Sequence, residues 1–253
     1  MKKLFLATTA FVVLAAASAG AADMYARPAY APPAAPAPVY TWTGMYWGAN
    51  VGYSWGQSKN DRTGSLIGLN ATVTESQDVD GVIGGVQTGY NYQFGTWVFG
   101  LETDIQASGQ KGGSTIPLLA LPPSTLTTDH KLQWFGTTRP RLGFLATPNL
   151  LLYGTAGVAY GQTKDTYIVN TVGVGTAATA SVNDVRAGWT AGGGIEGAFG
   201  GGWSAKVEYL YIDLGKLEQT VTVPPAALTA TFNSRLTDNI VRVGLNYKWG
   251  GGY

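Results

Sequence analysis

The stretch Trp97–Ala107 reads WVFGLETDIQA and alternates between two kinds of side chain. One set of alternate positions holds Trp97, Phe99, Leu101, Thr103 and Ile105, and the other holds Val98, Gly100, Glu102, Asp104 and Gln106. A period of two is typical of a β-strand, in which successive side chains point to opposite faces. Because the charges fall on one set only, the stretch predicts a strand with one apolar face and one polar face.

The same alternation recurs in seven other segments, which predicts eight strands in all. These segments are Met45–Gln57, Asp80–Gln93, Lys131–Leu145, Leu150–Gln162, Val185–Phe199, Trp203–Asp213 and Asp238–Trp249. The connections alternate between short turns near Gly95, Pro148 and Gly201 and long polar loops at Ser58–Val79, Ser108–His130, Thr163–Asp184 and Leu214–Thr237. An even number of strands, with short turns at one end and long loops at the other, is typical of an outer-membrane barrel.

The composition agrees with a β-protein whose outer surface is not in water. Of the 253 residues 12% are charged, whereas soluble domains average about 25%. The chain has 36 Gly, 8 Trp and 14 Tyr. The formal net charge is +1 and the basic side chains are dispersed, so we expect no nucleic-acid partner. The lack of cysteine excludes disulfides and thiolate metal sites.

The N-terminal region predicts export. Lys2 and Lys3 precede an apolar run of about 14 residues that is too short for a spanning helix, which needs about 20. Small residues follow, so we assign 1–22 to a signal peptide cleaved after Ala19 or Ala22. Residues 23–42 are rich in Ala and Pro and predict a periplasmic linker. Residues 43–253 are assigned to the barrel.

The apolar face of the strands is expected to face lipid. A soluble β-sandwich or lipocalin-like barrel would place that face inside and the charges in water. Against this alternative, the polar face is rich in Gly, Ser, Thr and Asn, and Trp and Tyr lie near strand ends, as in an interfacial girdle. The strands also span about 11–14 residues, which suits a tilted membrane crossing better than a globular sheet. We therefore predict a polar inside and an apolar outside.

The inward charges of such a barrel would form an ion network. Eight strands enclose a space that side chains can fill, and charges buried together must pair. The predicted network consists of Glu102, Asp104, Arg139, Arg141, Arg186, Glu196, Lys206, Glu208 and Arg242, with Lys248 as a further candidate. We expect a salt-bridged plug, and a narrow porin-type path for small solutes or ions remains the alternative.

No catalytic or metal site is predicted. The single histidine, His130, lies beside Asp129 in a long loop with Ser108 and Ser124 nearby, and a solvated loop histidine is the expected reading. No acidic cluster has ligand spacing, so we expect no cofactor and no enzyme activity. Haem capture through His130 or a tyrosine in the loops stays open as an alternative. Pro140 lies within a strand and predicts a local bulge.

Several segments resemble the alphaproteobacterial, rhizobial-type outer-membrane immunogenic proteins, a porin-like family of OmpA-type barrels. The similar segments are Tyr40–Tyr53, Gly84–Asn91, Trp134–Gly143, Leu152–Tyr160 and Lys206–Tyr211. Residues 242–249 also match a C-terminal barrel-assembly signal through Gly244, Tyr247 and Trp249. The family usually ends on the final aromatic residue, whereas here Gly250–Tyr253 follows.

The resemblance implies an eight-stranded, antiparallel, up-and-down transmembrane β-barrel in the cell outer membrane with a structural or surface-exposed role. It implies contact with outer-membrane lipid and lipopolysaccharide, and with the barrel-assembly machinery during biogenesis. We expect a monomer. A haem- or host-binding surface protein that acts through its loops is a further alternative.

Overall fold

The computed structural model describes residues 40–64, 69–118, 124–173, 175–223 and 228–249. The predicted signal peptide, most of the linker and the Gly250–Tyr253 extension lie outside these residues. The strands are β1 (Gly44–Gly64), β2 (Leu69–Phe94), β3 (Trp97–Ser108), β4 (Lys111–Leu118), β5 (Ser124–Thr147), β6 (Leu150–Thr171), β7 (Gly175–Gly200), β8 (Trp203–Val223) and β9 (Leu228–Trp249). A helix long and apolar enough to cross a membrane is not found in this described part.

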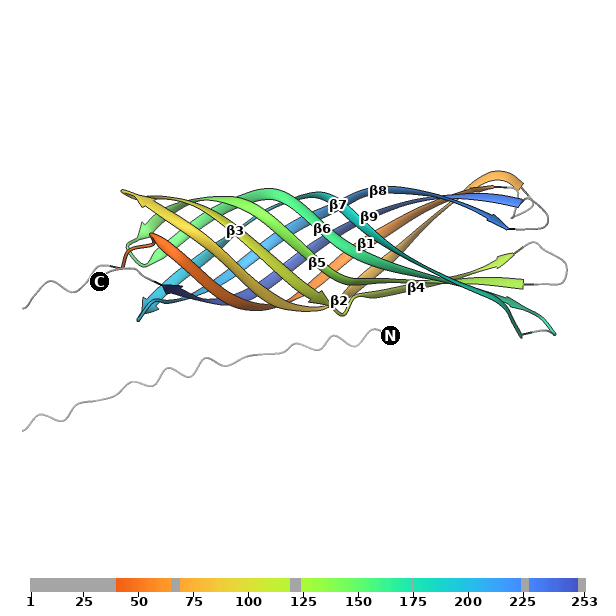
Figure 1. Cartoon of the computed structure of the whole chain (residues 1–253), viewed down its shortest axis with the longest axis horizontal. Coiled ribbons are helices and arrows are strands. Elements are labelled where there is room, and N and C mark those ends of the chain that lie inside the picture. Colours follow the sequence, from red (N-terminus) through yellow and green to blue (C-terminus); the bar gives the residue numbers. More distant parts are fainter. Residues whose placement is uncertain (1–39, 65–68, 119–123, 174, 224–227, 250–253) are drawn as a thin grey trace, which may run out of the picture. The chain divides into compact units, whose positions relative to one another are not determined.

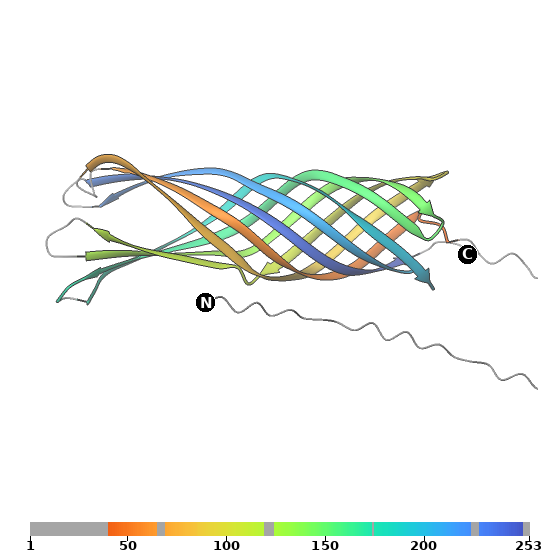
Figure 2. The ribbon, with the colours of Figure 1, turned by 180° about the vertical axis from the view of Figure 1, so that it is seen from behind.

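The strands form a closed ring. Each pairs antiparallel with its neighbours, and β1 pairs with both β2 and β9, which leaves no edge around the barrel wall. The segments β3 and β4 occupy one place in the ring, between β2 and β5, and are separated only by Gly109 and Gln110. The predicted eight-stranded, up-and-down barrel is therefore confirmed (Figures 1 and 2).

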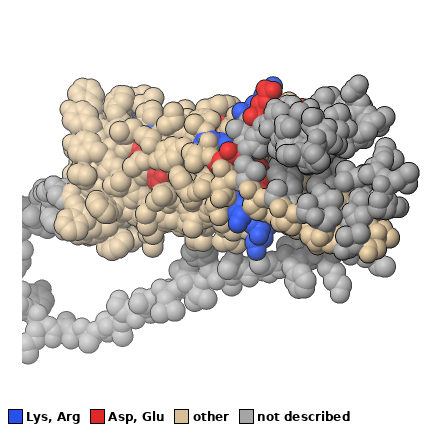
Figure 3. Space-filling model, turned by 45° about the vertical axis from the view of Figure 1, so that its right-hand side comes forward, with Lys and Arg blue, Asp and Glu red and all other residues tan. Residues whose placement is uncertain are grey.

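The two faces of the wall have the predicted orientation. Trp47, Phe99 and Leu101 lie on the outside with about half or more of each side chain exposed, whereas Glu102 is 2% exposed on the inside. In Figure 3 most of the described surface is uncharged, and the visible Lys, Arg, Asp and Glu gather mainly toward one end of it. An apolar outer surface around a closed hydrogen-bonded wall is what a hydrocarbon environment requires.

The long connections are not irregular loops. Strands predicted to span about 11–14 residues continue well past the apolar band, so that β2 and β7 each have 26 residues. The alternation of apolar outer residues ends where the lipid ends, but the backbone ladder does not depend on that alternation. The Thr- and Val-rich segments beyond the band therefore extend the same hairpins as strands.

Beyond the barrel wall the ring separates into two four-stranded sheets. The ladder between β7 and β8 ends at the pair Trp189–Asp213, and β2 contacts β4 only through the pair Asp80–Lys111. Toward the hairpin tips, within the described ranges, β4–β7 stay paired with one another, as do β8, β9, β1 and β2. Figures 1 and 2 show the two groups diverging at this end.

The bulge predicted at Pro140 is wrong. The register between β5 and β6 is the same on both sides of it, at Thr138–Val158 and at Arg141–Thr155. The Thr155 hydroxyl donates to the Pro140 carbonyl over 2.8 Å, and loss of one N–H donor does not require an inserted residue.

A register shift occurs instead between Leu132 and Trp134. Because a shift of one residue exchanges the two faces, Leu132 points inward and is 4% exposed, whereas Lys131 and Gln133 lie outside. The sequence alternation assigned all three residues to the opposite faces.

The interior is not uniformly polar, which corrects the expectation of a polar inside. On the hairpin side of the charged residues lies an outer apolar layer: Val79, Ile83, Leu132, Phe135, Ala159, Leu210, Ile212, Leu214, Leu236 and Ile240. On the side of the short turns lies a turn-side apolar layer: Trp42, Val98, Leu145, Leu151 and Tyr153, with Tyr40 and Ala198 packed against it. The charged residues are therefore enclosed between two apolar layers.

Candidate functional site

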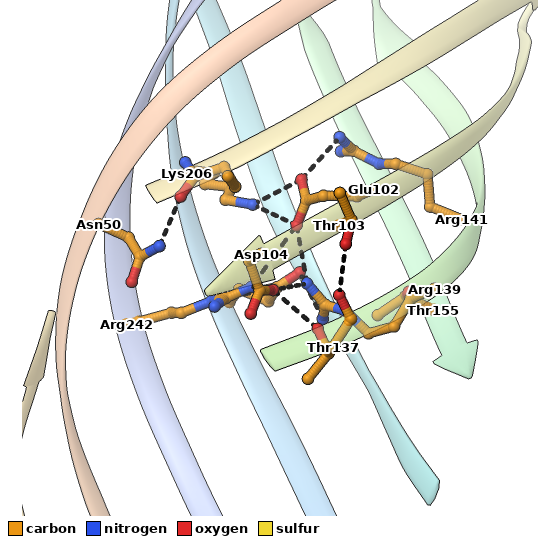
Figure 4. A network of polar contacts seen from close by, with 12 residues as sticks. Asn50, Glu102, Thr103, Asp104, Thr137, Arg139, Arg141, Thr155, Lys206 and Arg242 are labelled. Carbon is orange, nitrogen blue, oxygen red and sulfur yellow. Dashed lines mark hydrogen bonds and ion pairs between the residues drawn. The ribbon is translucent and has the colours of Figure 1, made fainter. Parts of the chain in front are cut away.

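Glu102 is the centre of the interior ion network. From β3 it reaches Arg139 on β5 at 2.7 Å, Lys206 on β8 at 2.8 Å and Arg242 on β9 at 3.5 Å. A fourth base, Arg141, lies 3.7 Å away. Figure 4 shows these side chains converging from different strands. Side chains from opposite parts of the wall thus meet and occupy the lumen.

The other three acids are paired as closely. Asp104 lies 3.0 Å from both Arg139 and Arg242, and the Thr137 hydroxyl donates to it over 2.8 Å. Glu208 lies 2.6 Å from Arg242, its direct cross-strand partner. Each of these carboxylates is almost fully buried, so it needs such partners to be tolerated.

Glu196 completes the network on the turn side. It lies 2.7 Å from Arg141 and accepts hydrogen bonds from Ser204 at 2.6 Å and Asn246 at 2.8 Å. The Arg141 guanidinium also lies over the Tyr153 ring at 4.0 Å. This part of the network therefore joins the ionic centre to the turn-side apolar layer.

The charges of the cluster balance. Its acids are Glu102, Asp104, Glu196 and Glu208, and its bases are Arg139, Arg141, Lys206 and Arg242. The sequence predicted an excess of bases because it included Arg186 and Lys248. Four acids against four bases give a formal charge of zero, which suits a site removed from water.

Glycine makes room for these long side chains. A Cβ at Gly100 would lie 2.8 Å from the Arg141 Cγ and 2.4 Å from the Asn91 Oδ1. A Cβ at Gly89 would lie 2.4 Å from the hydroxyl of Tyr46, which donates to Glu102 at 2.7 Å. Part of the high glycine content is thus explained by the interior ion network.

Arg186 lies outside the cluster. Its Nη1 donates to Ser234 over 3.2 Å, and its Nη2 lies 3.7 Å from Asp165. Asp165 also contacts Nδ1 of His130, which is 3% exposed. The expectation of a solvated His130 is therefore wrong, because β5 continues through this position and turns the side chain inward. No pattern in the sequence indicates this contact, since the two segments were assigned to different loops.

Lys248 also lies apart from the network, at the mouth of the barrel beside the short turns. Its Nζ contacts the Thr41 carbonyl and lies 4.5 Å from the Tyr40 ring centre. Trp42 is 2% exposed there, and its indole N–H donates to the Pro148 carbonyl over 3.1 Å. Residues 40–42, assigned to the linker, therefore pack across this mouth.

The environment of Tyr40 keeps its hydroxyl neutral. Burial, and then repulsion by Glu196, raises the pKa of the Tyr40 phenol to about 12. An uncharged Tyr40 ring suits its edge-on contact with Trp42 at 5.1 Å between ring centres.

The residues of the predicted assembly signal occupy both faces of β9. Tyr247 and Trp249 lie on the outside, and the Tyr247 ring packs 5.0 Å from that of Trp203. Gly244 points inward, where a Cβ would lie 3.2 Å from the Gln87 Nε2. The two aromatic residues are thus presented outward.

The described residues offer no cluster of three or more His, Cys, Asp or Glu side chains that could hold a metal ion. Within the cluster of four acids and four bases every charge has a partner of opposite sign, and the cluster can fill and rigidify the lumen.

Comparison with known proteins agrees with this architecture. The family model of the outer membrane protein beta-barrel domain matches residues 6–248. The chain is 41% identical to the 31 kDa outer-membrane immunogenic protein of Brucella melitensis biotype 1, over 98% of this chain and 100% of that protein. It is 28% identical to a 22 kDa outer membrane protein of Rhizobium leguminosarum bv. viciae, over 84% of this chain and 80% of that protein.

Among solved structures, the outer membrane protein OprG from Pseudomonas aeruginosa has a TM-score of 0.50 at 13% identity, covering 83% of this chain and 98% of that one. This similarity concerns the fold. The Brucella and Rhizobium relatives confirm the resemblance found in the sequence and the location in the outer membrane. The chain belongs to the outer membrane protein beta-barrel domain family.

Proposed function

We propose that this outer-membrane barrel acts as a closed, non-enzymatic wall element that stabilises the envelope and presents its hairpins at the surface. The observation that carries the proposal is the contact of Glu102 with bases on β5, β8 and β9, because these contacts cross the lumen. The Brucella relatives are named as immunogenic outer-membrane proteins, which supports a surface-exposed role.

The two apolar layers support a closed lumen. An ion crossing the barrel would have to lose its water in both apolar layers. The outer layer includes Phe135, Leu210 and Ile240. The turn-side layer includes Val98 and Leu151. The ion would then meet charges that are already paired. Both steps are unfavourable, since desolvating an ion costs several kcal/mol or more.

Planar-bilayer recording tests this proposal. We expect the refolded mature chain, with its fold checked by a heat-dependent gel shift, to give no steady single-channel steps. A known porin in the same bilayer serves as positive control. Large steady steps from the pure protein would overturn the closed barrel.

A narrow channel is the second candidate, and unpartnered polar groups favour it. Both amide atoms of Gln77 and of Gln106 are buried without a hydrogen-bond partner. Such groups suit water inside the barrel. Small, reproducible conductance that depends on Gln106 would support this candidate.

Activity as a hydrolase and haem capture through His130 have little support. The His130–Asp165 contact resembles half of a catalytic triad, but within the described ranges no hydroxyl hydrogen-bonds to the buried Nε2. The same burial removes His130 from the surface where a loop would capture haem. Haem titration followed by the Soret band tests the remaining route through loop tyrosines.

The proposed partners are those expected from the sequence. They are the lipid and lipopolysaccharide of the outer membrane, and the assembly machinery that would recognise outward-facing Tyr247 and Trp249. The barrel is proposed to act as a monomer, since the ring is closed without a second copy.

A further inference from the structure

Two rows of cations cross the protruding sheets. In the sheet of β4–β7, Lys111 is the direct cross-strand partner of Lys131, and Lys131 is the partner of Lys164. In the other sheet Arg235 is the partner of both Lys59 and Lys216. We call these the lysine row and the mixed row. Within a row, basic side chains from three adjacent strands stand side by side.

Both rows face outward. Lys111, Lys131, Lys59 and Lys216 are exposed, and Lys164 alternates with the buried residues Thr163 and Asp165 of β6. Figure 3 shows Lys and Arg side chains (blue) on the surface where the uncharged part of the barrel (tan) meets the grey residues. The rows therefore contact whatever surrounds the barrel at that height.

The lysine row lies at the height of the lipid headgroups of the outer leaflet. On β5 the lipid-facing residues run from Phe144 to Trp134. The ten residue steps between them cover about 25 Å of membrane at a rise of about 3.3 Å and a tilt of about 40°. Trp134 packs edge-on against Tyr160 at 6.4 Å, as expected of an interfacial girdle. Lys131 and Lys164 lie three and four residues beyond this aromatic pair, toward the hairpin tips.

The lysine row is compensated only at one end, where the exposed Asp80 is the cross-strand partner of Lys111. Lys131, in the middle, has a lysine as its partner on either side. Among the described residues, no carboxylate forms a salt bridge with Lys111, Lys131 or Lys164, whereas Arg235 in the mixed row pairs with Asp213. Like charges placed directly opposite one another destabilise a sheet. An anion supplied from outside would remove this repulsion.

We propose that the lysine row binds the phosphate groups of a phosphorylated lipid in the outer leaflet of the outer membrane. Its three ammonium groups form a line at headgroup height, where phosphates of neighbouring lipids are concentrated. The mixed row offers a weaker second contact, because one of its cations is already paired. This inference rests on the placement of the barrel in the outer membrane and does not depend on a closed lumen. A measured channel conductance would therefore not contradict it.

Energy transfer from tryptophan to dansyl-labelled, bisphosphorylated lipid A tests the site. The full mature chain is placed in phosphatidylcholine vesicles that contain a small fraction of the labelled lipid. We expect K131Q to weaken binding about fivefold and the triple variant K111Q/K131Q/K164Q about a hundredfold, since each lysine near an anionic surface contributes about fivefold.

Matched variants separate charge from structure. We expect the triple arginine variant K111R/K131R/K164R to bind within about twofold of the unmodified chain, and K248Q, at the opposite end of the barrel, to bind unchanged. Equal binding by the triple glutamine variant would overturn the proposal. Equal binding of dephosphorylated lipid, or full displacement by a matching concentration of inorganic phosphate, would overturn it too.

Unfolding by urea gives a second readout that still works if the triple variant does not fold. In phosphatidylcholine alone, K131Q should unfold at a urea concentration equal to or above that of the unmodified chain, because repulsion is relieved. With lipid A present it should unfold at a lower concentration. The same direction in both membranes would contradict the proposed site.

Discussion

At the scale of single residues, the interior is shaped as much by missing side chains as by charged ones. Gly100 lies beside Arg141 and Asn91, and its position leaves no space for a methyl group. Gly197, on β7, has no atom within 4 Å of the place where its Cβ would be. The two glycines form a natural pair for comparison.

We expect G100A to lower the free energy of unfolding by about 1–3 kcal/mol, because overpacking displaces the network. The control G197A should change it by less than about 1 kcal/mol, since an unstrained alanine there limits only the unfolded chain. Urea unfolding of both variants in lipid vesicles measures the difference. Equal effects would mean that interior crowding is not what holds glycine at position 100.

The charged residues of the network could be identified from the sequence because strand parity determines which way they point. Glu102 and Arg139 follow from this rule directly. Their partners across the lumen, such as Lys206, could not be assigned, because parity gives a direction but not a height or a distance. The inward position of His130 was missed for a different reason, since its segment carries no apolar alternation.

At the scale of strands, the hydrogen-bonded ladder of β5 accommodates Pro140, a residue type that usually interrupts a strand. Pro140 is exposed on the outside of β5, and the register is unchanged around it. Its carbonyl accepts from Thr155 on β6, so its missing N–H would also point toward β6.

Replacing this proline should restore the missing ladder hydrogen bond. We expect P140V to raise the free energy of unfolding by about 1 kcal/mol, the usual net contribution of one such bond. Urea unfolding checks the value, with the outward substitution L142V on the same strand as the control for side-chain size. If P140V lowers the free energy of unfolding, the proline ring stabilises the barrel by more than the missing ladder hydrogen bond costs.

The strand ends were the least predictable elements. Lipid imposes the alternation that makes a strand visible in the sequence, and this constraint stops at the headgroups. The extensions of β1 after Gln57 and of β2 before Asp80 therefore look like loops in the sequence, although the ladder continues to the described ends. The register shift between Leu132 and Trp134 could not be predicted either, because one extra residue in a strand does not change the composition of the segment.

At the scale of the whole molecule, the interior ion network ties distant strands together. Glu102 contacts all four bases of the cluster. Removing its charge leaves three acids for four buried bases, and an uncompensated buried charge is strongly unfavourable.

We expect E102Q to lower the free energy of unfolding by about 3–5 kcal/mol, the range found when one partner of a buried ion pair is lost. Its control is E218Q, which removes the same charge from an exposed outer position and should cost less than about 0.5 kcal/mol. Chemical unfolding in the same vesicles compares them. A difference below about 1 kcal/mol would show that water, and not the bases, solvates Glu102.

The position of Glu102 also bears on the order of folding events. Its carboxylate needs Arg139 from the neighbouring strand β5, but also Lys206 and Arg242 from β8 and β9, which are the last strands of the chain. An intermediate that lacks β8 and β9 would leave Glu102 with only two of its four bases, Arg139 and Arg141 of β5. Partly assembled barrels should therefore be short-lived, and the last two strands should complete insertion and charge neutralisation in one cooperative step.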